Sequence, residues 1–142
     1  MIAIDIDPKK IEMARKNAQI YGVEDRIEFI VGDTLKILPG LTSVEVIFLS
    51  PPWGGPEYIN TDSFNLKDDI PIDGFNLFDK CLEVTENIAY FVPRNTNVDQ
   101  LISLAGSGGC VEVEQNILNR KIKSITAYYG DLISTENNMY YD

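Results

Sequence analysis

The sequence predicts an α/β fold in which a mostly parallel sheet is closed by an antiparallel hairpin. Short apolar runs alternate with segments of helical periodicity, a pattern typical of parallel strands joined by helices. The last two apolar runs are joined by a short turn that contains Asn119 and Arg120, which is typical of an antiparallel hairpin. The 142 residues are 44% hydrophobic and 24% charged, which favours one domain with a core of its own.

The first elements are expected to be a strand, a helix and a second strand. Residues 1–6 form an apolar run that predicts a buried strand. A helix follows, because Asp7 is a good N-cap, Pro8 suits the first helical position and Gly22 suits the carboxyl-terminal cap. Alternating apolar residues predict the second strand over 26–31. The buried face of the helix is expected to consist of Ile11, Ala14, Ala18 and Tyr21.

The same patterns assign the remaining elements. A short helical turn is expected over 34–38, where Pro39 and Gly40 stop it. Residues 44–49 predict a third strand, apolar enough to be buried on both faces. The later elements are a helix at 74–84, a strand at 87–92, a helix at 97–104 and hairpin strands at 111–118 and 122–129.

Charge and cysteine content exclude several classes of function. The net charge of −10 disfavours general adhesion to nucleic acid or to an anionic membrane, although a local basic pocket for one phosphorylated end remains compatible with it. Cys81 and Cys110 are too few for a disulfide framework, and without histidine they do not make a zinc site. The sequence has neither an apolar run of membrane-spanning length nor a signal-peptide pattern. A reducing compartment, no metal and no membrane partner are therefore expected.

Polar residues suited to a nucleoside follow the first two predicted strands. Asp5 and Asp7 end the first strand, and Asp33 follows the second. Ligands of open α/β sheets bind at these carboxyl ends, where one carboxylate can accept both ribose hydroxyls and another an exocyclic amine. Simpler interpretations remain open: Asp7 and Asp33 could be helix caps, and Asp5 a plain strand-end acid. A nicotinamide dehydrogenase also uses a strand-end acid for ribose.

The third strand is followed by the loop SPPWGGPEY, residues 50–58. Its prolines fix the backbone, so the carbonyls of Ser50 and Pro51 can serve as rigid acceptors for an aromatic amine. Trp53 offers a flat face against which a base can stack, worth about 1–3 kcal/mol, and a cationic base would add cation–π attraction. The adjacent glycines let the backbone approach a ligand closely. The alternative interpretation of Trp53 is a core aromatic.

These features together resemble S-adenosyl-L-methionine-dependent methyltransferases, and the SPPW sequence resembles the (Asp/Asn/Ser)-Pro-Pro-(Tyr/Phe/Trp) motif of those that act on exocyclic amines. The resemblance becomes specific to the trimethylguanosine synthase family over IAIDIDPKKIEMARKNAQIYGV, IEFIVGD, SPPWGGPEY, NIAYFVPRN, SLAG, VEVEQN and ITAYYGDLI. It implies a Rossmann-like class I methyltransferase sheet with helices on both faces. The implied reaction is N2-methylation of the 7-methylguanosine cap of small nuclear and nucleolar RNA, in the nucleus and also in the cytoplasm.

The resemblance also implies roles for individual residues. It makes Ser50, Pro51 and Trp53 catalytic, with Trp53 beneath the cationic cap base. It assigns the cofactor to Asp5, Ile6, Asp33 and Thr34, and the remaining substrate contacts to Tyr58, Arg94 and Asn95. From the sequence alone, the alternative for Arg94 is a solvated surface charge. The methyltransferase domain is expected over 1–133, followed by a loose tail at 134–142.

Relative to the family, the sequence is expected to lack the first strand and its glycine-rich turn. In the usual strand order the missing strand is the central one, so residues 1–6 and 44–49 would lose a shared neighbour. They could pair with each other, or the chain could be a fragment or an incomplete gene model. We therefore expect weak or no turnover from this chain alone. Two other functions stay open: an adenine amino-group methyltransferase of DNA or ribosomal RNA, and a non-catalytic cap-binding remnant.

Overall fold

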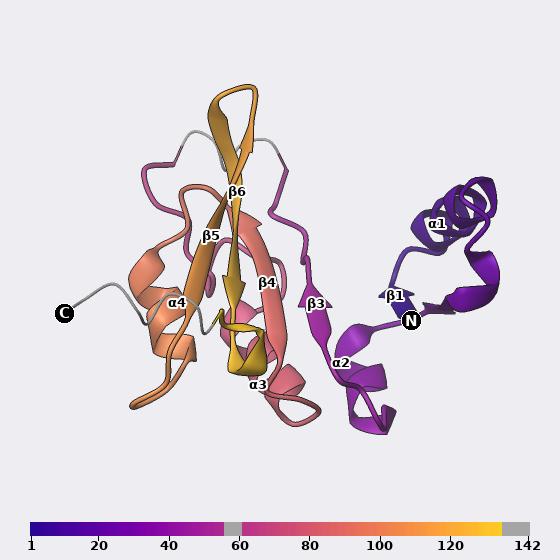
Figure 1. The fold of residues 1–142 in the computed structure, drawn as a ribbon, viewed down its shortest axis with the longest axis horizontal. Helices are drawn as coiled ribbons and strands as arrows, with labels where there is room; N and C mark the ends of the chain where they lie inside the picture. The colour runs from indigo at the N-terminus through magenta and orange to yellow at the C-terminus, as the bar shows by residue number, and fades with distance from the viewer. Residues whose placement is uncertain (56–60, 135–142) are drawn as a thin grey trace. The chain divides into compact units, whose positions relative to one another are not determined.

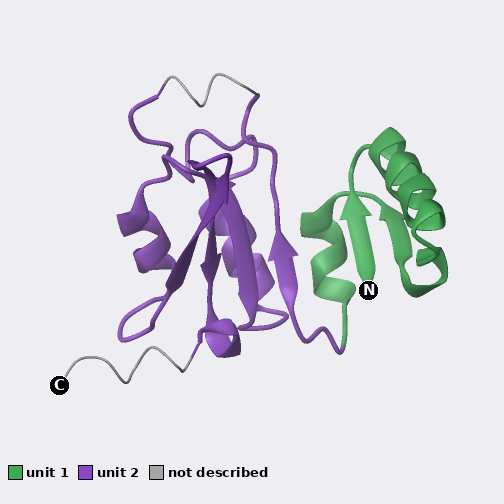
Figure 2. Cartoon of the chain, turned by 45° about the horizontal axis from the view of Figure 1, so that its top comes forward, with its two compact units in different colours: residues 1–42 green, residues 43–142 purple. Residues whose placement is uncertain are grey.

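The computed structural model describes residues 1–55 and 61–134. These residues form two compact units, residues 1–42 and residues 43–142, which Figure 2 shows in different colours. Each unit is described by itself below. No helix in the described part of the chain is both long enough and apolar enough to cross a membrane.

The first unit contains two parallel strands and two helices. Strand β1 (Ile2–Asp5) pairs with β2 (Glu28–Val31), helix α1 (Pro8–Ile20) connects them, and helix α2 (Thr34–Ile37) follows β2. These elements confirm the predicted order of this segment.

Both ends of α1 also follow the prediction. Asp7 caps the amino end by accepting a hydrogen bond from the Lys9 backbone nitrogen at 2.8 Å. Gly22 follows the helix with a φ of 66°, the left-handed conformation that glycine adopts most readily. The expected buried face is only half right, because Ile11 and Ala18 are buried but Tyr21 is 80% exposed.

The second unit is a four-stranded sheet in the order β3-β4-β6-β5 (Figure 1). Its strands are β3 (Ile47–Leu49), β4 (Ile88–Pro93), β5 (Glu112–Leu118) and β6 (Lys121–Tyr128), with helices α3 (Gly74–Leu82) and α4 (Val98–Leu104). Strands β3 and β4 are parallel, whereas β6 is antiparallel to β4 and to β5. The predicted hairpin at the edge of the sheet is confirmed. Its two turn residues, Asn119 and Arg120, both have positive φ, as the tightest hairpin turns require.

The core of the second unit lies between this sheet and the helices α3 and α4, which Figure 1 shows on one face of it. Phe78 of α3 stacks on Tyr90 with ring centroids 6.1 Å apart and meets the Tyr129 ring edge-on at 4.6 Å. The Tyr129 hydroxyl donates to the backbone carbonyl of Leu101 at 3.0 Å, which joins α4 to the sheet. Burial raises the pKa of both tyrosines above its usual value, and it raises the pKa of the Cys81 thiol to about 12.

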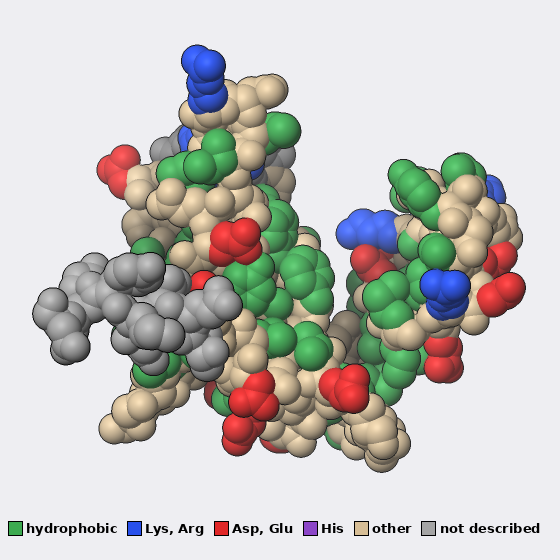
Figure 3. Space-filling view, in the orientation of Figure 1, with side chains coloured by type: hydrophobic (Ala, Val, Ile, Leu, Met, Phe, Trp, Pro, Cys, Tyr) green, Lys and Arg blue, Asp and Glu red, His purple; other side chains and the backbone are tan. Residues whose placement is uncertain are grey.

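Two strands are less buried than the sequence predicts. Ile2 of β1 is 40% exposed, and Phe48 of β3 is 64% exposed. The prediction assumed a sheet covered on both faces, but among the described residues β1 pairs only with β2 and β3 only with β4. Figure 3 shows hydrophobic side chains gathered over β3 and β4, on the face of the sheet opposite α3 and α4.

Candidate methyl-transfer site

The candidate cofactor residues lie at one edge of the two-stranded sheet. Asp5 is the last residue of β1 and pairs with Val31, the last residue of β2. The ladder continues one residue further, because the Gly32 nitrogen donates to the Asp5 carbonyl at 3.0 Å. The strand ends thus bring Asp5 and Asp33 to the same edge, as the parallel arrangement predicts.

Each of these carboxylates already has a structural role. One oxygen of Asp5 accepts a hydrogen bond from the Asp7 nitrogen at 2.8 Å, and one of Asp33 accepts from the Leu35 nitrogen at 3.0 Å. The interpretation of Asp33 as a helix cap is therefore correct for α2. The second oxygen of each makes a long contact with a lysine, at 3.8 Å between Asp5 and Lys10 and 3.7 Å between Asp33 and Lys36. These bonds thus leave each carboxylate with acceptor capacity for a ligand.

These two carboxylates fit the nucleoside part of S-adenosylmethionine. Both side chains are about one-third exposed, at 33% each, and both are acceptors, whereas ribose hydroxyls and an adenine amine are donors. Ile6, 70% exposed, follows β1, and the half-buried Thr34 begins α2, so both flank the same edge.

Gly32 has a packing role that the sequence did not reveal. A Cβ atom at this position would lie 2.8 Å from Cδ1 of Ile37, so the side chain of Ile37 occupies the space that a larger residue would need. A larger residue at position 32 would therefore require the Ile37 side chain to move.

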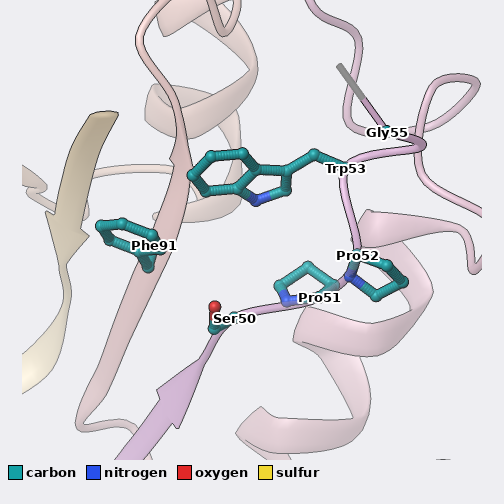
Figure 4. Close-up of a pocket in the computed structure, with 6 residues that line it drawn as sticks. All are labelled: Ser50, Pro51, Pro52, Trp53, Gly55 and Phe91. Atoms are coloured by element: carbon teal, nitrogen blue, oxygen red, sulfur yellow. The ribbon is translucent and has the colours of Figure 1, made fainter. Parts of the chain in front are cut away.

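A slot opens where β3 ends. It has a volume of about 350 Å³ and is lined by Ser50, Pro51, Pro52, Trp53, Gly55 and Phe91. Figure 4 shows the Trp53 indole across this space from Ser50 and Pro51, with the Phe91 ring at its side. Trp53 is half-buried, and one side of its ring is in contact with Phe91. A flat ring facing a rigid proline segment is a geometry suited to a planar ligand.

The two glycines after Trp53 have the conformations that make this loop possible. Gly54 and Gly55 have φ values of 77° and 95°, a region that other residues rarely adopt. A Cβ on Gly54 would also lie 3.5 Å from the Asp69 carbonyl oxygen, so the following segment packs behind the loop. The glycines thus turn the chain sharply after the indole.

Phe91 is the slot residue that the sequence analysis missed. Its ring centroid is 5.2 Å from that of Trp53, with the planes tilted by 33°, and 6.1 Å from that of Phe48. Its neighbours Tyr90 and Val92 point into the core, so the alternation of β4 directs Phe91 to the opposite face. The strand pattern could have indicated this, because Phe91 belongs to the same face as Ala89 rather than Tyr90.

Arg94 and Asn95 follow the end of β4, which is parallel to β3, so both lie at the edge of the sheet where the slot opens. Arg94 is exposed, and its guanidinium donates to the Ile122 carbonyl at 3.4 Å. Asn95 is used within the protein, because its side-chain nitrogen donates to the backbone carbonyl of Thr61 at 2.9 Å and to the Thr61 hydroxyl at 3.2 Å. Tyr58 lies outside the described residues.

The chain returns to this edge through Phe64, which is 1% exposed. The Phe64 nitrogen donates to the Asn95 carbonyl at 2.8 Å, and its carbonyl accepts from the Asn97 nitrogen at 2.9 Å. These bonds tie the segment after the loop to the residues that follow β4. The sequence did not predict this contact, because an isolated bridge between two residues produces no periodic pattern of apolar residues.

Within residues 1–55 and 61–134, no group of three or more cysteine, aspartate or glutamate side chains is arranged to hold a metal ion.

Comparison with known proteins shows which families and proteins the sequence of this chain is similar to. Residues 1–132 match the family described as RNA cap guanine-N2 methyltransferase. The trimethylguanosine synthase of Schizosaccharomyces pombe is 34% identical over 135 residues, which cover 92% of this chain and 56% of that protein. The trimethylguanosine synthase of Saccharomyces cerevisiae is 34% identical over 103 residues, which cover 69% of this chain and 33% of that protein. The chain thus spans about half the length of the first relative, or a third of the second.

Solved structures agree on the fold. The precorrin 8W decarboxylase of Methanobacterium thermoautotrophicum matches with a TM-score of 0.58 and 16% identity, over 91% of this chain and 68% of that one. A methyltransferase from Geobacter sulfurreducens matches with a TM-score of 0.53 and 15% identity, over 90% of this chain and 56% of that one. The predicted class I Rossmann-like methyltransferase fold is confirmed. With a family match over nearly the whole sequence, the chain belongs to the RNA cap guanine-N2 methyltransferase family.

Proposed function

We propose that this chain methylates the exocyclic N2 amine of the 7-methylguanosine cap of small nuclear and nucleolar RNA, with S-adenosylmethionine as methyl donor. The observation that carries the proposal is the slot at the end of β3, where the Trp53 ring faces Ser50 and Pro51. Family membership supports the substrate class. This substrate makes the nucleus the proposed location, with the cytoplasm as an additional one.

The loop backbone would hold the reacting amine. A proline has no N–H to donate, so the carbonyls of Ser50 and Pro51 present acceptors without competing donors between them. Accepting the amine protons would leave the nitrogen lone pair free to attack a methyl group. In-line transfer needs this orientation and proximity, and the surplus proton leaves the product nitrogen to solvent.

Trp53 would bind the base by its face. Stacking on an indole is worth about 1–3 kcal/mol for any base. The 7-methylguanine ring also carries a delocalised positive charge, so cation–π attraction adds to stacking for the methylated cap and not for unmethylated guanine. We propose that this difference gives the slot its preference for caps already methylated at N7.

Arg94 would bind the cap phosphates, with Tyr58 as a second ligand and Asn95 beside them. The guanidinium of Arg94 is exposed at the edge where the slot opens, and its hydrogen bond to the Ile122 carbonyl is long, at 3.4 Å. It therefore keeps donors for a phosphate, which a planar fork binds in a bidentate manner. A single such site is compatible with the net charge of −10, because only one phosphorylated end has to be bound.

The first unit would hold the cofactor. Asp5 would accept the ribose hydroxyls and Asp33 the adenine amine, with Ile6 and Thr34 flanking them. When bound, S-adenosylmethionine supplies a methyl group on a sulfonium, which is reactive without a metal. The residues of this chain then need only to bind and orient the two reactants.

We further propose that the chain by itself turns over slowly. Among the described residues, the two strands that carry the site, β1 and β3, each pair with a single neighbour. Exposed apolar side chains such as Phe48 lie on β3, one of these two strands. Strands with one partner open more easily, which weakens the geometric control that transfer requires.

Transfer of a radiolabelled methyl group to a 7-methylguanosine-capped RNA tests the proposal. We expect slow incorporation that Trp53→Ala abolishes and that an RNA with an unmethylated guanosine cap does not support. Label on adenine would instead establish the adenine amino-group alternative. Cap binding without S-adenosylmethionine binding would establish the non-catalytic alternative. Rapid turnover would contradict the proposal of weak activity while leaving the reaction intact.

A further inference from the structure

The slot has a second aromatic wall. Phe91 lines it together with Trp53, and the two ring centroids are 5.2 Å apart with planes tilted by 33°. Phe91 reaches the slot from β4, whereas Trp53 reaches it from the loop after β3 (Figure 4). Two aromatic rings from neighbouring parallel strands thus meet at one opening.

The spacing of the two rings determines where a base can lie. A base inserted between two rings needs centroids about 7 Å apart, twice the usual contact distance between carbon atoms. Because Trp53 and Phe91 are closer than that, they contact each other, and no base fits between them. A ligand must instead occupy the space between the indole and the Ser50–Pro51 segment, with Phe91 at its edge.

We propose that Phe91 is a specificity-determining residue that, with Trp53, forms a two-walled aromatic site selective for a cationic purine. This inference rests on the proposed function and adds to it the residue that distinguishes charged from neutral bases. Phe91 would act in two ways: its π electrons would lie beside the positive charge at the edge of the base, and its ring would exclude water from one side of the slot. Cation–π attraction rises from about 0.5–1 kcal/mol at exposed sites to about 2 kcal/mol when the contact is desolvated.

The aromatic and the apolar contributions of Phe91 can be separated. An apolar wall alone would favour methylated and unmethylated guanine alike, since both bury similar area. A π face favours only the base that carries a charge. Replacing Phe91 with leucine keeps an apolar side chain and removes the π face, so it should lower the selectivity rather than the affinity for the neutral base.

The test is a fluorescence titration, since Trp53 is the only tryptophan in the sequence. Quenching gives the dissociation constants of 7-methylguanosine diphosphate and guanosine diphosphate, and their ratio measures selectivity. We expect Phe91→Leu to lower this ratio about two- to fivefold, the range set by exposed cation–π contacts. The dissociation constant of guanosine diphosphate should hardly change, and Phe91→Tyr should retain the ratio.

Phe48→Leu is the matched control. Phe48 is in the same aromatic row, 6.1 Å from Phe91, but it is 64% exposed and does not line the slot. Its replacement should leave the selectivity ratio unchanged. Far-ultraviolet circular dichroism verifies that each variant is folded, and Phe91→Met serves as a second non-aromatic replacement if Phe91→Leu unfolds.

The outcomes separate this inference from the proposed function. If the unmodified protein binds both nucleotides equally, the proposed function fails. If it prefers 7-methylguanosine diphosphate and the folded Phe91 variants keep that preference, the role of Phe91 is overturned while the proposed function stands. An equal loss of affinity for both nucleotides would show that Phe91 contributes only apolar area, and would also overturn the inference.

Discussion

The side-chain amide of Asn95 donates to the backbone carbonyl of Thr61 across 2.9 Å, which joins two segments 34 residues apart in sequence. The contact lies next to the pairing between Phe64 and the residues after β4. Together these bonds fix the point at which the chain re-enters the sheet after the candidate substrate loop. Asn95 therefore ties Thr61 and Phe64 to the segment that follows β4.

Replacing Asn95 with alanine should loosen this re-entry point. We expect a loss of roughly 1 kcal/mol in the free energy of unfolding, the net value of one or two hydrogen bonds to neutral groups. Amide hydrogen exchange should accelerate at residues 61–66 more than in β4. Asn76→Ala, at an exposed position of α3, is the control and should change neither measurement. Unchanged exchange in the Asn95 variant would contradict the tethering role.

Asp33 combines a helix cap with a proposed cofactor contact, and two substitutions separate them. Asparagine also caps helices, so Asp33→Asn should leave the stability nearly unchanged. The same variant should bind S-adenosylmethionine at least about tenfold more weakly, because a hydrogen bond to a charged acceptor is worth roughly 1.5–3 kcal/mol. Asp33→Ala should lose about 1 kcal/mol of stability as well.

Isothermal titration calorimetry measures the affinity of these variants for S-adenosylmethionine, and urea unfolding measures their stability. Asp25, an exposed acid in the same unit, provides the control variant Asp25→Asn, for which neither quantity should change. Tight cofactor binding by Asp33→Asn would limit Asp33 to its capping role.

Arg94 should contribute to the binding of cap phosphates and not of the base. Arg94→Ala is expected to weaken the binding of 7-methylguanosine diphosphate about tenfold while leaving the nucleoside 7-methylguanosine unaffected, because one charge-assisted phosphate contact is lost. The difference in affinity for 7-methylguanosine diphosphate between the unmodified protein and Arg94→Ala should shrink as the salt concentration rises, since the site is exposed. Trp53 fluorescence measures both ligands, and Arg120→Ala, in the hairpin turn, is the control. Equal losses for nucleoside and diphosphate would argue against a phosphate contact.

The buried thiol of Cys81 makes stability depend on alkaline pH. Its pKa is about 12 in the folded protein, whereas an unfolded thiol titrates near 8.5, so the folded chain retains a proton that the unfolded chain loses. The stabilising contribution is complete below about pH 8.5 and is lost as the pH rises toward 12. The tyrosines of the same core act in the same direction above about pH 10.

Urea unfolding between pH 8 and 10.5 measures this dependence. Above pH 9.5, the free energy of unfolding should fall with pH more steeply in the unmodified protein than in Cys81→Ala. The two slopes should differ by about 1.4 kcal/mol per pH unit, because the unfolding of the unmodified protein releases one more proton. Cys110 is exposed, so Cys110→Ala should keep the full slope. A Cys81→Ala slope identical to that of the unmodified protein would rule out this thiol as the cause.

Local signals in the sequence predicted much of the fold. The cap of α1 at Asp7, the left-handed residue Gly22 and the turn at Asn119 each depend on a few neighbouring residues, and the structure confirms all three. The strand ends that carry Asp5 and Asp33 were predictable for the same reason, since parallel strands end at a common edge.

Properties that depend on distant residues were not predictable in this way. Burial of Phe48 depends on how many strands and helices cover β3, which no local pattern encodes. The roles of Phe64 and Phe91 depend on contacts between segments far apart in sequence. The apolar sequence of β4 indicates that its residues are buried. It does not indicate which face of the sheet each side chain lies on, and so does not show that Phe91 and Tyr90 lie on opposite faces.

The boundary between the two compact units, after residue 42, coincides with a division of labour in the proposed reaction. The residues assigned to the methyl donor all precede it, and those assigned to the methyl acceptor all follow it. Defects in the two half-reactions can therefore be sorted genetically, because substitutions of the assigned residues before residue 43 should alter affinity for the donor, and substitutions of the assigned residues after it should alter affinity for the acceptor.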